Sequence, residues 1–284
     1  MPKSASRALL TDFLKKRRAR LSPSDFGFEN DMSGRRTPGL RRSEVARLAG
    51  VSTEWYTLFE MGRDRAMTQR IIERVVAALQ LNSAERDYVY ELVRAEAPPQ
   101  GPAELHPAIT FGVDNVVAGS VIVYDPWLTR VRSNHVARTL WMLTEDTDQD
   151  WQSRNALWML FRAQGTRFLD GPIWLEHARR NLGLFRRALG RDPRNPQAQA
   201  LIEALRGTPH FDELWTAHDV YSFEMFSNDG IRPTPLQHPT FGTLVVSTLM
   251  LEIPGWPGAH LRYVAPADAH TTDVVRTLGR SRLG

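Results

Sequence analysis

Apolar residues recur every three or four positions through most of the first hundred residues of the chain. This spacing gives a helix one apolar side, so it predicts a series of amphipathic helices. A first helix is expected over residues 6–20, with Phe13 and Leu14 facing inward and Lys15–Arg18 mostly facing solvent. The N-terminal part of the chain is therefore expected to be all helical.

Two short helices joined by a tight turn are predicted within Arg41–Glu60. Gly50 ends the first helix, because glycine adopts the left-handed cap conformation without strain. Ser52 is a good N-cap for the second helix, whose apolar side includes Tyr56 and Phe59. The pattern is typical of a helix-turn-helix, in which the second helix enters the major groove of DNA. An ordinary helical hairpin packed in a core is the alternative.

Two more helices follow, beginning near Thr68 and Ser83. With the first three they make a five-helix domain, expected over residues 1–96. Residues 97–107 hold four prolines and a glycine, which cannot continue a helix, and are the expected linker.

The period of the pattern changes in the second domain, expected over residues 108–284. Alternating apolar residues and turn signals predict strands over residues 121–124, 128–131, 221–226, 243–251 and 261–265. The intervening residues 134–206 are mainly helical in pattern. The expected fold class is therefore multidomain, an all-α domain followed by an α+β domain with a five-stranded antiparallel sheet and helices against one face.

The composition of the chain excludes several kinds of site. The 284 residues are 42% hydrophobic and 24% charged, enough to form a globular core. The absence of cysteine excludes disulfides, thiolate zinc sites and thiol nucleophiles. No signal-peptide pattern and no bilayer-length apolar run is present, so a cytoplasmic protein without membrane partners is expected.

The charge is distributed unevenly. Residues 1–100 hold 18 Lys and Arg against 13 Asp and Glu, a net charge of +5, and the remainder carries −1. A basic excess beside a helix-turn-helix is the expected electrostatic footprint of double-stranded DNA binding. A cationic membrane-binding helix is the weaker alternative, because no large apolar face opposes the basic residues of the first helix.

The chain resembles the MmyB-like branch of the XRE-type helix-turn-helix transcription regulators. Its N-terminal part carries this resemblance in Phe13-Leu14, Arg17–Pro23, Arg36–Arg42, Val45-Ala46, Leu48–Ser52, Tyr56-Thr57, Glu60 and Gly62-Arg63. Its C-terminal part carries it in Arg154-Asn155, Leu160-Phe161, Leu214-Trp215, His218–Val220 and His238-Pro239.

The resemblance implies a PAS-like ligand-binding domain with an apolar pocket, a fatty-acid-like effector and DNA binding as a homodimer. Two departures from the family's pattern stand out. Leu58 occupies a position of the second helix where family members usually have a long polar side chain. Arg132–Asn134 stands where the family usually has Ala-Trp-Asn. Leu58 indicates either contact with a thymine methyl group or a different operator.

Thr53, Glu54 and Thr57 lie on the exposed N-terminal side of the second helix, where this motif reads bases. Glu54 is interpreted either as an acceptor from a cytosine amino group or as a solvated residue that complements the helix dipole. Arg41 and Arg42 begin the preceding helix, where phosphate contact and a solvated charge pair are the alternatives. The full predicted DNA-binding set is Arg35, Arg36, Arg41, Arg42, Ser52, Thr53, Glu54, Trp55, Thr57, Leu58 and Arg63. Glu60 is expected to form a structural ion pair with Arg17 or Arg18.

Large aromatic residues of the second domain are expected to be mostly core, with some lining a pocket. The predicted ligand-pocket set is Asn134, Trp158, Phe161, Trp174, Trp215 and His218. His218 has no second histidine at metal-ligand spacing, so no metal is expected, and no cofactor other than the apolar effector.

The sequence contains no Gly-x-Gly-x-x-Gly, phosphate loop or Gly-x-Ser-x-Gly elbow, so an enzyme is not expected. The predicted function is a DNA-binding transcriptional regulator that senses a small apolar ligand. The alternative is a protein-interaction or ligand-binding module with weakened DNA binding.

Overall fold

The computed structural model describes residues 3–28, 39–63, 68–94, 104–143, 150–163, 169, 171–221 and 232–280. The chain divides into two compact units: residues 1–97 with 189–194, here the N-terminal unit, and residues 98–188 with 195–284, the C-terminal unit. Residues 97–103 of the predicted linker lie outside the described residues, so the linker and the domain boundaries stay predictions.

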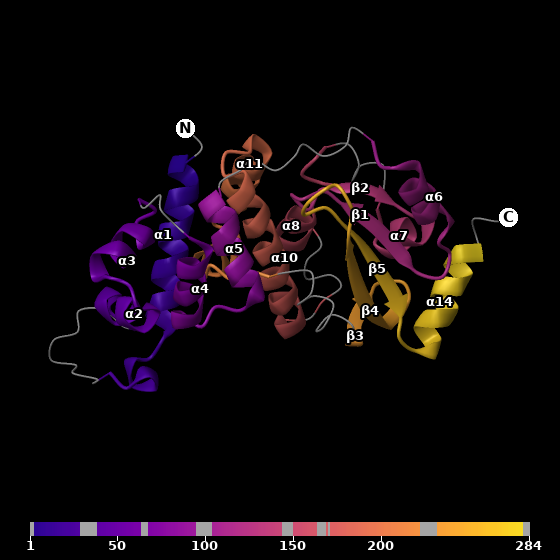
Figure 1. Cartoon of the computed structure of the whole chain (residues 1–284). Coiled ribbons are helices and arrows are strands. Elements are labelled where there is room, and N and C mark those ends of the chain that lie inside the picture. The colour runs from indigo at the N-terminus through magenta and orange to yellow at the C-terminus, as the bar shows by residue number, and fades with distance from the viewer. Residues whose placement is uncertain are drawn as a thin grey trace. The chain divides into compact units, whose positions relative to one another are not determined.

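The N-terminal unit is helical, as predicted (Figure 1). Its elements are α1 (Lys3–Arg20), the short 3-10 helix η1 (Pro23–Phe26), α2 (Arg42–Ala49), α3 (Thr53–Glu60), α4 (Gln69–Ala78) and α5 (Ser83–Arg94). Phe13 of α1 and Tyr88 of α5 meet edge to face at 5.2 Å between ring centroids, inside a fully buried core. This aromatic contact joins the first and last helices of the unit.

The turn between α2 and α3 forms as the local signals predict. Gly50 has φ of 60°, and its backbone N–H donates to the carbonyls of Ala46 and Arg47. The Ser52 hydroxyl accepts a hydrogen bond from the Trp55 backbone N–H at 3.0 Å. Cap and turn together satisfy backbone groups that a helix leaves unpaired at its ends.

The C-terminal unit is an α+β domain. It contains α6 (Pro107–Asn115), β1 (Ser120–Tyr124), β2 (Arg130–Ser133), α7 (His135–Leu140), α8 (Ala156–Trp158), the π-helical turn η3 (Met159–Ala163), α10 (Gly171–Arg191, of which residues 189–191 belong to the N-terminal unit), α11 (Pro196–Leu205), α12 (Phe211–Thr216), β3 (Thr234–His238), β4 (Gly242–Glu252), β5 (His260–Pro266) and α14 (Ala269–Arg280). The five strands pair antiparallel in the order β2-β1-β5-β4-β3, which confirms the predicted antiparallel sheet.

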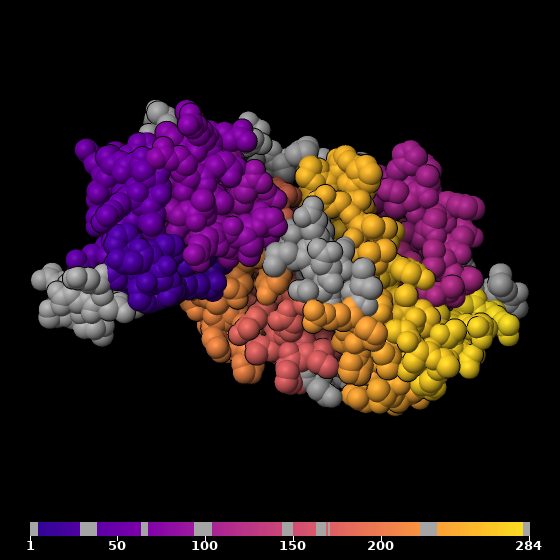
Figure 2. Space-filling view, turned by 60° about the horizontal axis from the view of Figure 1, so that its bottom comes forward, coloured from indigo at the N-terminus to yellow at the C-terminus, as the bar shows by residue number. Residues whose placement is uncertain are grey.

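Helices pack against both faces of the sheet. On one face, Val246 and Val264 pack against α7 and against Val275 and Leu278 of α14. In Figure 2, α14 (yellow) lies at the surface of the C-terminal unit. On the opposite face, Val121 and Val123 of β1 pack against α6. The expectation that helices cover one face is therefore wrong, because residues 107–115 form a helix that the strand pattern alone did not reveal.

The third strand of the sheet is not the segment predicted over residues 221–226, most of which lies outside the described residues. Tyr221 is not in a strand, and residues 222–226 lie outside the described residues. The strand instead is β3, Thr234–His238, which includes Pro235. Proline is disfavoured in a central strand because it lacks the N–H that would pair with a neighbouring strand. Strand β3 is at the edge of the sheet and tolerates it.

No helix among the described residues is long and apolar enough to cross a membrane.

Candidate DNA-binding surface and ligand cavity

The N-terminal side of α3 presents its predicted readout residues at the surface. Thr53 and Glu54 are exposed, as is the N-cap Ser52. Thr57 is half-buried, and its hydroxyl donates to the Thr53 carbonyl at 2.7 Å. Trp55 is also half-buried and stacks on Phe59, with ring centroids 5.2 Å apart. Contacts within α3 thus support its exposed first turn.

Leu58 keeps 37% of its surface exposed, although it is apolar. Leu48 of α2 and Met61 after α3 are also exposed apolar residues. The departure at Leu58 is therefore a surface feature and not a packing requirement of the core.

Glu60 is fully buried and is surrounded by three donors. Its carboxylate accepts from Arg18 Nε at 2.8 Å, from Arg42 Nε at 2.7 Å and from the Tyr56 hydroxyl at 3.2 Å. Burial alone would raise the pKa of Glu60, but the hydrogen bonds and charges of Arg18 and Arg42 lower it below its usual value. Burial and the nearby carboxylate raise the pKa of Tyr56.

Of the two arginines predicted to pair with Glu60, Arg18 is the one that does so. Arg17 instead pairs with Glu85 at 2.8 Å, and its guanidinium lies 4.8 Å from the centre of the Phe13 ring. Arg17 is buried and Arg18 half-buried, so the expectation that these two arginines face solvent is wrong. The helical pattern did not reveal that their partners lie in other helices.

The predicted phosphate contacts divide into three groups. Arg41 and Arg63 are exposed. Arg42 keeps 38% of its side chain exposed but is held by Glu60, so its first role in the free protein is a structural ion pair. Arg35 and Arg36 lie outside the described residues.

Arg74 of α4 is an exposed arginine whose contact with the turn before α3 was not predicted from the sequence. Its Nη2 donates to the carbonyl of Gly50, in the turn before α3, at 2.6 Å. A cation at the carboxyl end of a helix complements the helix dipole. No local signal links α4 to this turn, so only the packing of α4 on α2 reveals the contact.

The C-terminal unit contains a cavity of about 520 Å³ on the sheet face that α7 and α14 also cover. Side chains alternate across a strand, and the register places Ile122, Tyr124, Thr248, Arg262 and Val264 on this one face. Helix α10 supplies a second wall, and Met159, Leu160 and Leu169 contribute apolar surface. The volume is within the range of small-molecule sites.

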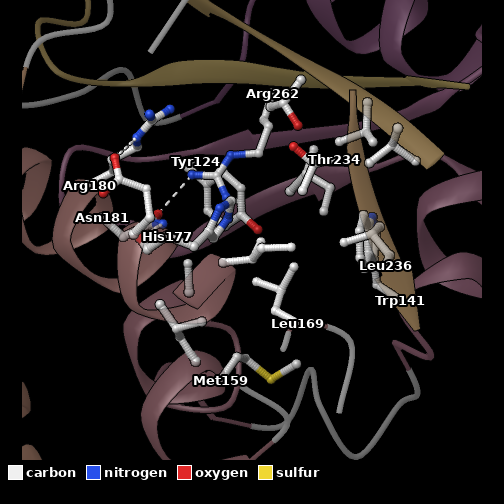
Figure 3. Close-up of a pocket in the computed structure, with 18 of the residues that line it drawn as sticks. Tyr124, Trp141, Met159, Leu169, His177, Arg180, Asn181, Thr234, Leu236 and Arg262 are labelled. Atoms are coloured by element: carbon white, nitrogen blue, oxygen red, sulfur yellow. Dashed lines mark hydrogen bonds and ion pairs between the residues drawn. The ribbon is translucent and has the colours of Figure 1, made fainter. Parts of the chain in front are cut away.

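Arg262, Asn181, His177 and Tyr124 lie close together in the wall of the cavity (Figure 3). Arg262 is 91% buried, its Nη2 donates to Asn181 Oδ1 at 2.9 Å, and its guanidinium lies 4.9 Å from the centre of the Tyr124 ring. Arg180 pairs with Glu176 at 2.6 Å on the same helix. Burial lowers the pKa of Arg262. Burial, then the charges of Arg262 and Arg180, lower the pKa of His177 to about 3, so this imidazole is neutral at pH 7.

None of the six predicted pocket residues is among those that line this cavity. Asn134 is buried and caps α7, since its Oδ1 accepts from the backbone N–H groups of Val121 and Ala137, both at 2.9 Å. Its Nδ2 donates to the carbonyls of Val116 and Gly119. Asn134 thus joins β1 to α7.

The predicted aromatic residues lie in a neighbouring cluster. Phe161 meets Trp174 and Phe211 edge to face, and Phe211 stacks on Trp215. The Trp174 indole N–H donates to the carbonyl of Leu160, a residue of the cavity wall. The cluster therefore supports that wall from behind.

Two more predicted pocket residues lie elsewhere in the C-terminal unit. Trp158 packs under the Arg162 guanidinium at 5.5 Å. His218 follows α12 with φ of 55°, and its backbone N–H donates to the Trp215 carbonyl.

The cavity residues that sequence reasoning missed are Tyr124, His177, Asn181 and Arg262. One signal was present: Arg262 lies within the strand predicted over residues 261–265, at a position that alternation assigns to the same face as Val264. A charged residue at such a position conflicts with an apolar face, and such conflicts are expected at functional sites.

Two family models match the chain. The ligand-binding domain of MmyB-like transcription regulators matches residues 105–278, and a helix-turn-helix domain matches residues 9–89. The chain belongs to the MmyB-like transcription regulators. A comparison with curated proteins found no match.

This MmyB-like regulator combines a DNA-binding module with a ligand-binding domain, and both families are regulatory and not enzymatic. The helix-turn-helix implies DNA as a partner and the second domain implies a small molecule. Within the described residues, no group of three or more His, Asp and Glu is arranged to hold a metal ion.

Proposed function

We propose that this regulator binds a specific operator through α3 and that a small apolar ligand in the C-terminal cavity controls this binding. The observation that carries the proposal is the cavity of about 520 Å³ in the domain that matches the ligand-binding model. A packed domain without a ligand role has few voids larger than a water molecule.

The DNA-binding half of the proposal is supported by the exposed first turn of α3. Thr53 and Glu54 present a hydroxyl and a carboxylate at the end of the helix that enters the major groove in this motif. Arg41 and Arg63 are exposed on either side of that helix in sequence, and arginines at such positions bind phosphates. Glu60 fixes α1, α2 and α3 together, which pre-organises the surface.

The ligand half is supported by the walls of the cavity. Aliphatic and aromatic side chains, including Ile122, Leu160, Leu169, Leu236 and Val264, supply most of its lining. Apolar lining with a few convergent polar groups is typical of a small-molecule site. A fatty-acid-like effector is the ligand class we propose.

The proposed mechanism is a change of spacing within a homodimer. Two copies of α3 bind two operator half-sites only when the distance between them matches about one turn of DNA. A ligand that binds one dimer geometry better than the other shifts the population toward it, and thereby changes the affinity for DNA.

The test is retention of the full chain on DNA taken from upstream of its own coding region, beside a scrambled competitor, over a salt series. Specific retention with a steep salt slope is expected, because phosphate contacts release counterions. Addition of decanoate is then expected to change retention of the specific DNA. Equal, weak binding to both DNAs would favour the alternative function, an interaction module with weakened DNA binding.

A further inference from the structure

The exposed side of the recognition helix α3 carries two apolar side chains in line with its first-turn carboxylate. Successive residues of a helix are about 100° apart around its axis, so positions 54, 58 and 61 fall in one narrow stripe. Leu58 and Met61 keep 37% and 36% of their surface exposed, and Glu54 is exposed as well. The Met61 backbone N–H donates to the Thr57 carbonyl at 3.0 Å, so Met61 continues the helical spacing. Glu54, Leu58 and Met61 form the exposed stripe of α3.

The opposite side of α3 is fixed in the core. Tyr56, Phe59 and Glu60 are fully buried, and Arg18 and Arg42 hold the Glu60 carboxylate. The helical spacing puts the exposed stripe about half a turn away from these buried residues. In a helix-turn-helix the second helix lies in the major groove with the side that its own domain leaves uncovered. The exposed stripe is therefore the part of α3 that meets base edges when DNA is bound.

The side chains of this helix limit which bases it can read. No Arg, Lys, Asn or Gln occurs between Ser52 and Met61, and these are the residue types that pair with guanine or adenine through two hydrogen bonds. A carboxylate such as that of Glu54 accepts from the amino group of cytosine, and an apolar side chain contacts the 5-methyl group of thymine. The Thr53 hydroxyl can bond to more than one base and discriminates little. Discrimination by α3 is thereby left to thymine and cytosine.

We infer that Leu58 and Met61 determine the operator sequence by packing on thymine methyl groups in the major groove, while Glu54 accepts a hydrogen bond from a cytosine amino group. The exposed stripe extends about 10 Å along α3, which is roughly three base-pair steps of 3.4 Å. A half-site with two thymines and a cytosine within about four base pairs matches that length. This inference rests on the proposed DNA-binding function and adds to it the chemistry that the operator presents.

The test begins with selection of an operator from a pool of random duplexes by the full chain. The selected duplex is then synthesised with thymine and with uracil, which pairs with adenine as thymine does but lacks the 5-methyl group. Burial of one methyl group corresponds to about a fourfold change in affinity, so the parent chain is expected to bind the uracil duplex about fourfold more weakly for each methyl group contacted.

Two variants assign the methyl contacts to residues. Leu58→Ala and Met61→Ala are each expected to weaken binding to the thymine duplex by about 4- to 10-fold. On the uracil duplex they are expected to cause little further loss, because the methyl partner is already absent. Such non-additivity is the signature of a direct contact.

The matched control is Leu48→Ala. Leu48 is 38% exposed, as Leu58 nearly is, but belongs to α2 and not to the exposed stripe of α3. This variant is expected to keep the full difference in affinity between the thymine and uracil duplexes. Thermal melting establishes that each variant is folded, which is expected because substitutions at exposed positions change stability little.

The carboxylate is tested by a change of preference. Glu54→Gln is expected to select adenine where the parent selects cytosine, because glutamine pairs with N6 and N7 of adenine. An unchanged base at this position would overturn the role given to Glu54.

The remaining outcomes separate this inference from the proposed function. Equal affinity of the parent chain for the thymine and uracil duplexes, with a selected operator in hand, would overturn the inference and leave specific DNA binding intact. A loss on uracil DNA that Leu58→Ala and Met61→Ala both retain in full would also overturn it, since other residues would then contact the methyl groups. Unchanged affinity of both variants for both duplexes would overturn it and leave the exposed stripe to a protein partner. Failure to enrich any duplex would overturn the proposed operator binding and this inference with it.

Discussion

Arg18 and Glu60 are 42 positions apart in the chain, yet Nε of Arg18 lies 2.8 Å from Oε2 of Glu60, which is fully buried. The pair attaches the end of the recognition helix α3 to α1, and Arg42 attaches the start of α2 to the same carboxylate. One buried charge thus sets the relative position of three helices.

Glu60→Ala is expected to destabilise the N-terminal unit by about 3 kcal/mol, because it leaves the half-buried Arg18 without its counter-charge. The measurement is hydrogen exchange of peptides covering α1, α2 and α3, in which exchange is expected to become faster. Glu54→Ala, which removes an exposed carboxylate from the same helix, is the control and is expected to have little effect. Equal protection in the two variants would contradict the role given to Glu60.

Arg42→Ala is expected to change mainly the stability of the protein, and Arg63→Ala mainly the salt dependence of DNA binding. Arg63 is exposed, so its removal is expected to lower the salt slope of DNA binding by about one and to leave thermal stability unchanged. Arg42 is paired with Glu60, so its removal is expected to lower the stability by about 1 kcal/mol and to alter the salt slope less. The reverse pattern would mean that Arg42 leaves Glu60 for a phosphate when DNA binds.

Leu58→Arg is expected to restore the long polar side chain that the family usually has in the recognition helix. Leu58 is 37% exposed, so arginine fits without disturbing the core. Non-specific DNA affinity and the salt slope are expected to rise, the slope by about one, because one more phosphate contact forms. Electrophoretic mobility shifts on the operator and on scrambled DNA check this, with Leu58→Gln as the uncharged control. A loss of specific binding alone would show that Leu58 itself reads the operator.

Asp125→Asn is expected to stabilise the C-terminal unit at pH 8 and not at pH 4. Burial raises the pKa of Asp125 to about 6, so the stabilisation from its proton is present below pH 3.8 and is lost as the pH rises through 6. Asparagine stays neutral, and its single oxygen can keep both backbone hydrogen bonds, from Trp127 and Thr129. The free energy of unfolding, measured in urea at pH 8, is expected to increase by about 1 kcal/mol for this half-buried site. An equal gain at both pH values would contradict the role of its charge.

His177 is expected to make the C-terminal unit less stable as the pH falls. Its pKa is about 3 in the folded chain against 6.5 ordinarily, because burial and the charges of Arg262 on β5 and Arg180 on α10 disfavour its protonation. The stability that neutral His177 contributes is therefore complete above pH 6.5 and declines between pH 6.5 and 3, since the unfolded chain binds the proton first. The free energy of unfolding, measured in urea, is expected to fall between pH 7.5 and pH 5 by about 1 kcal/mol more in the parent chain than in His177→Gln. Identical pH dependence of the two proteins would contradict this assignment.

The N-terminal unit could be predicted closely because its signals are local. A left-handed glycine at Gly50 and a serine cap at Ser52 act within a few residues of themselves, so the sequence determines the turn before any tertiary contact forms. The basic excess of residues 1–100 and the exposure of the first turn of α3 could also be predicted from the sequence. The partner of Glu60 was narrowed to two arginines, and the choice between them depended on how α1 packs against α3.

The ligand cavity was decided by the tertiary structure. Aromatic residues such as Trp174 and Trp215 suggested a pocket, because core clusters and ligand sites use the same residue types, but these residues support its wall from behind. Arg262 and Asn181 are 81 positions apart and come together through the register of β5 and the packing of α10. Alternation along a strand assigns a side chain to a face but not to a position in the sheet. Only the strand order placed Arg262 at the centre of a covered face, where burial makes its charge require a partner.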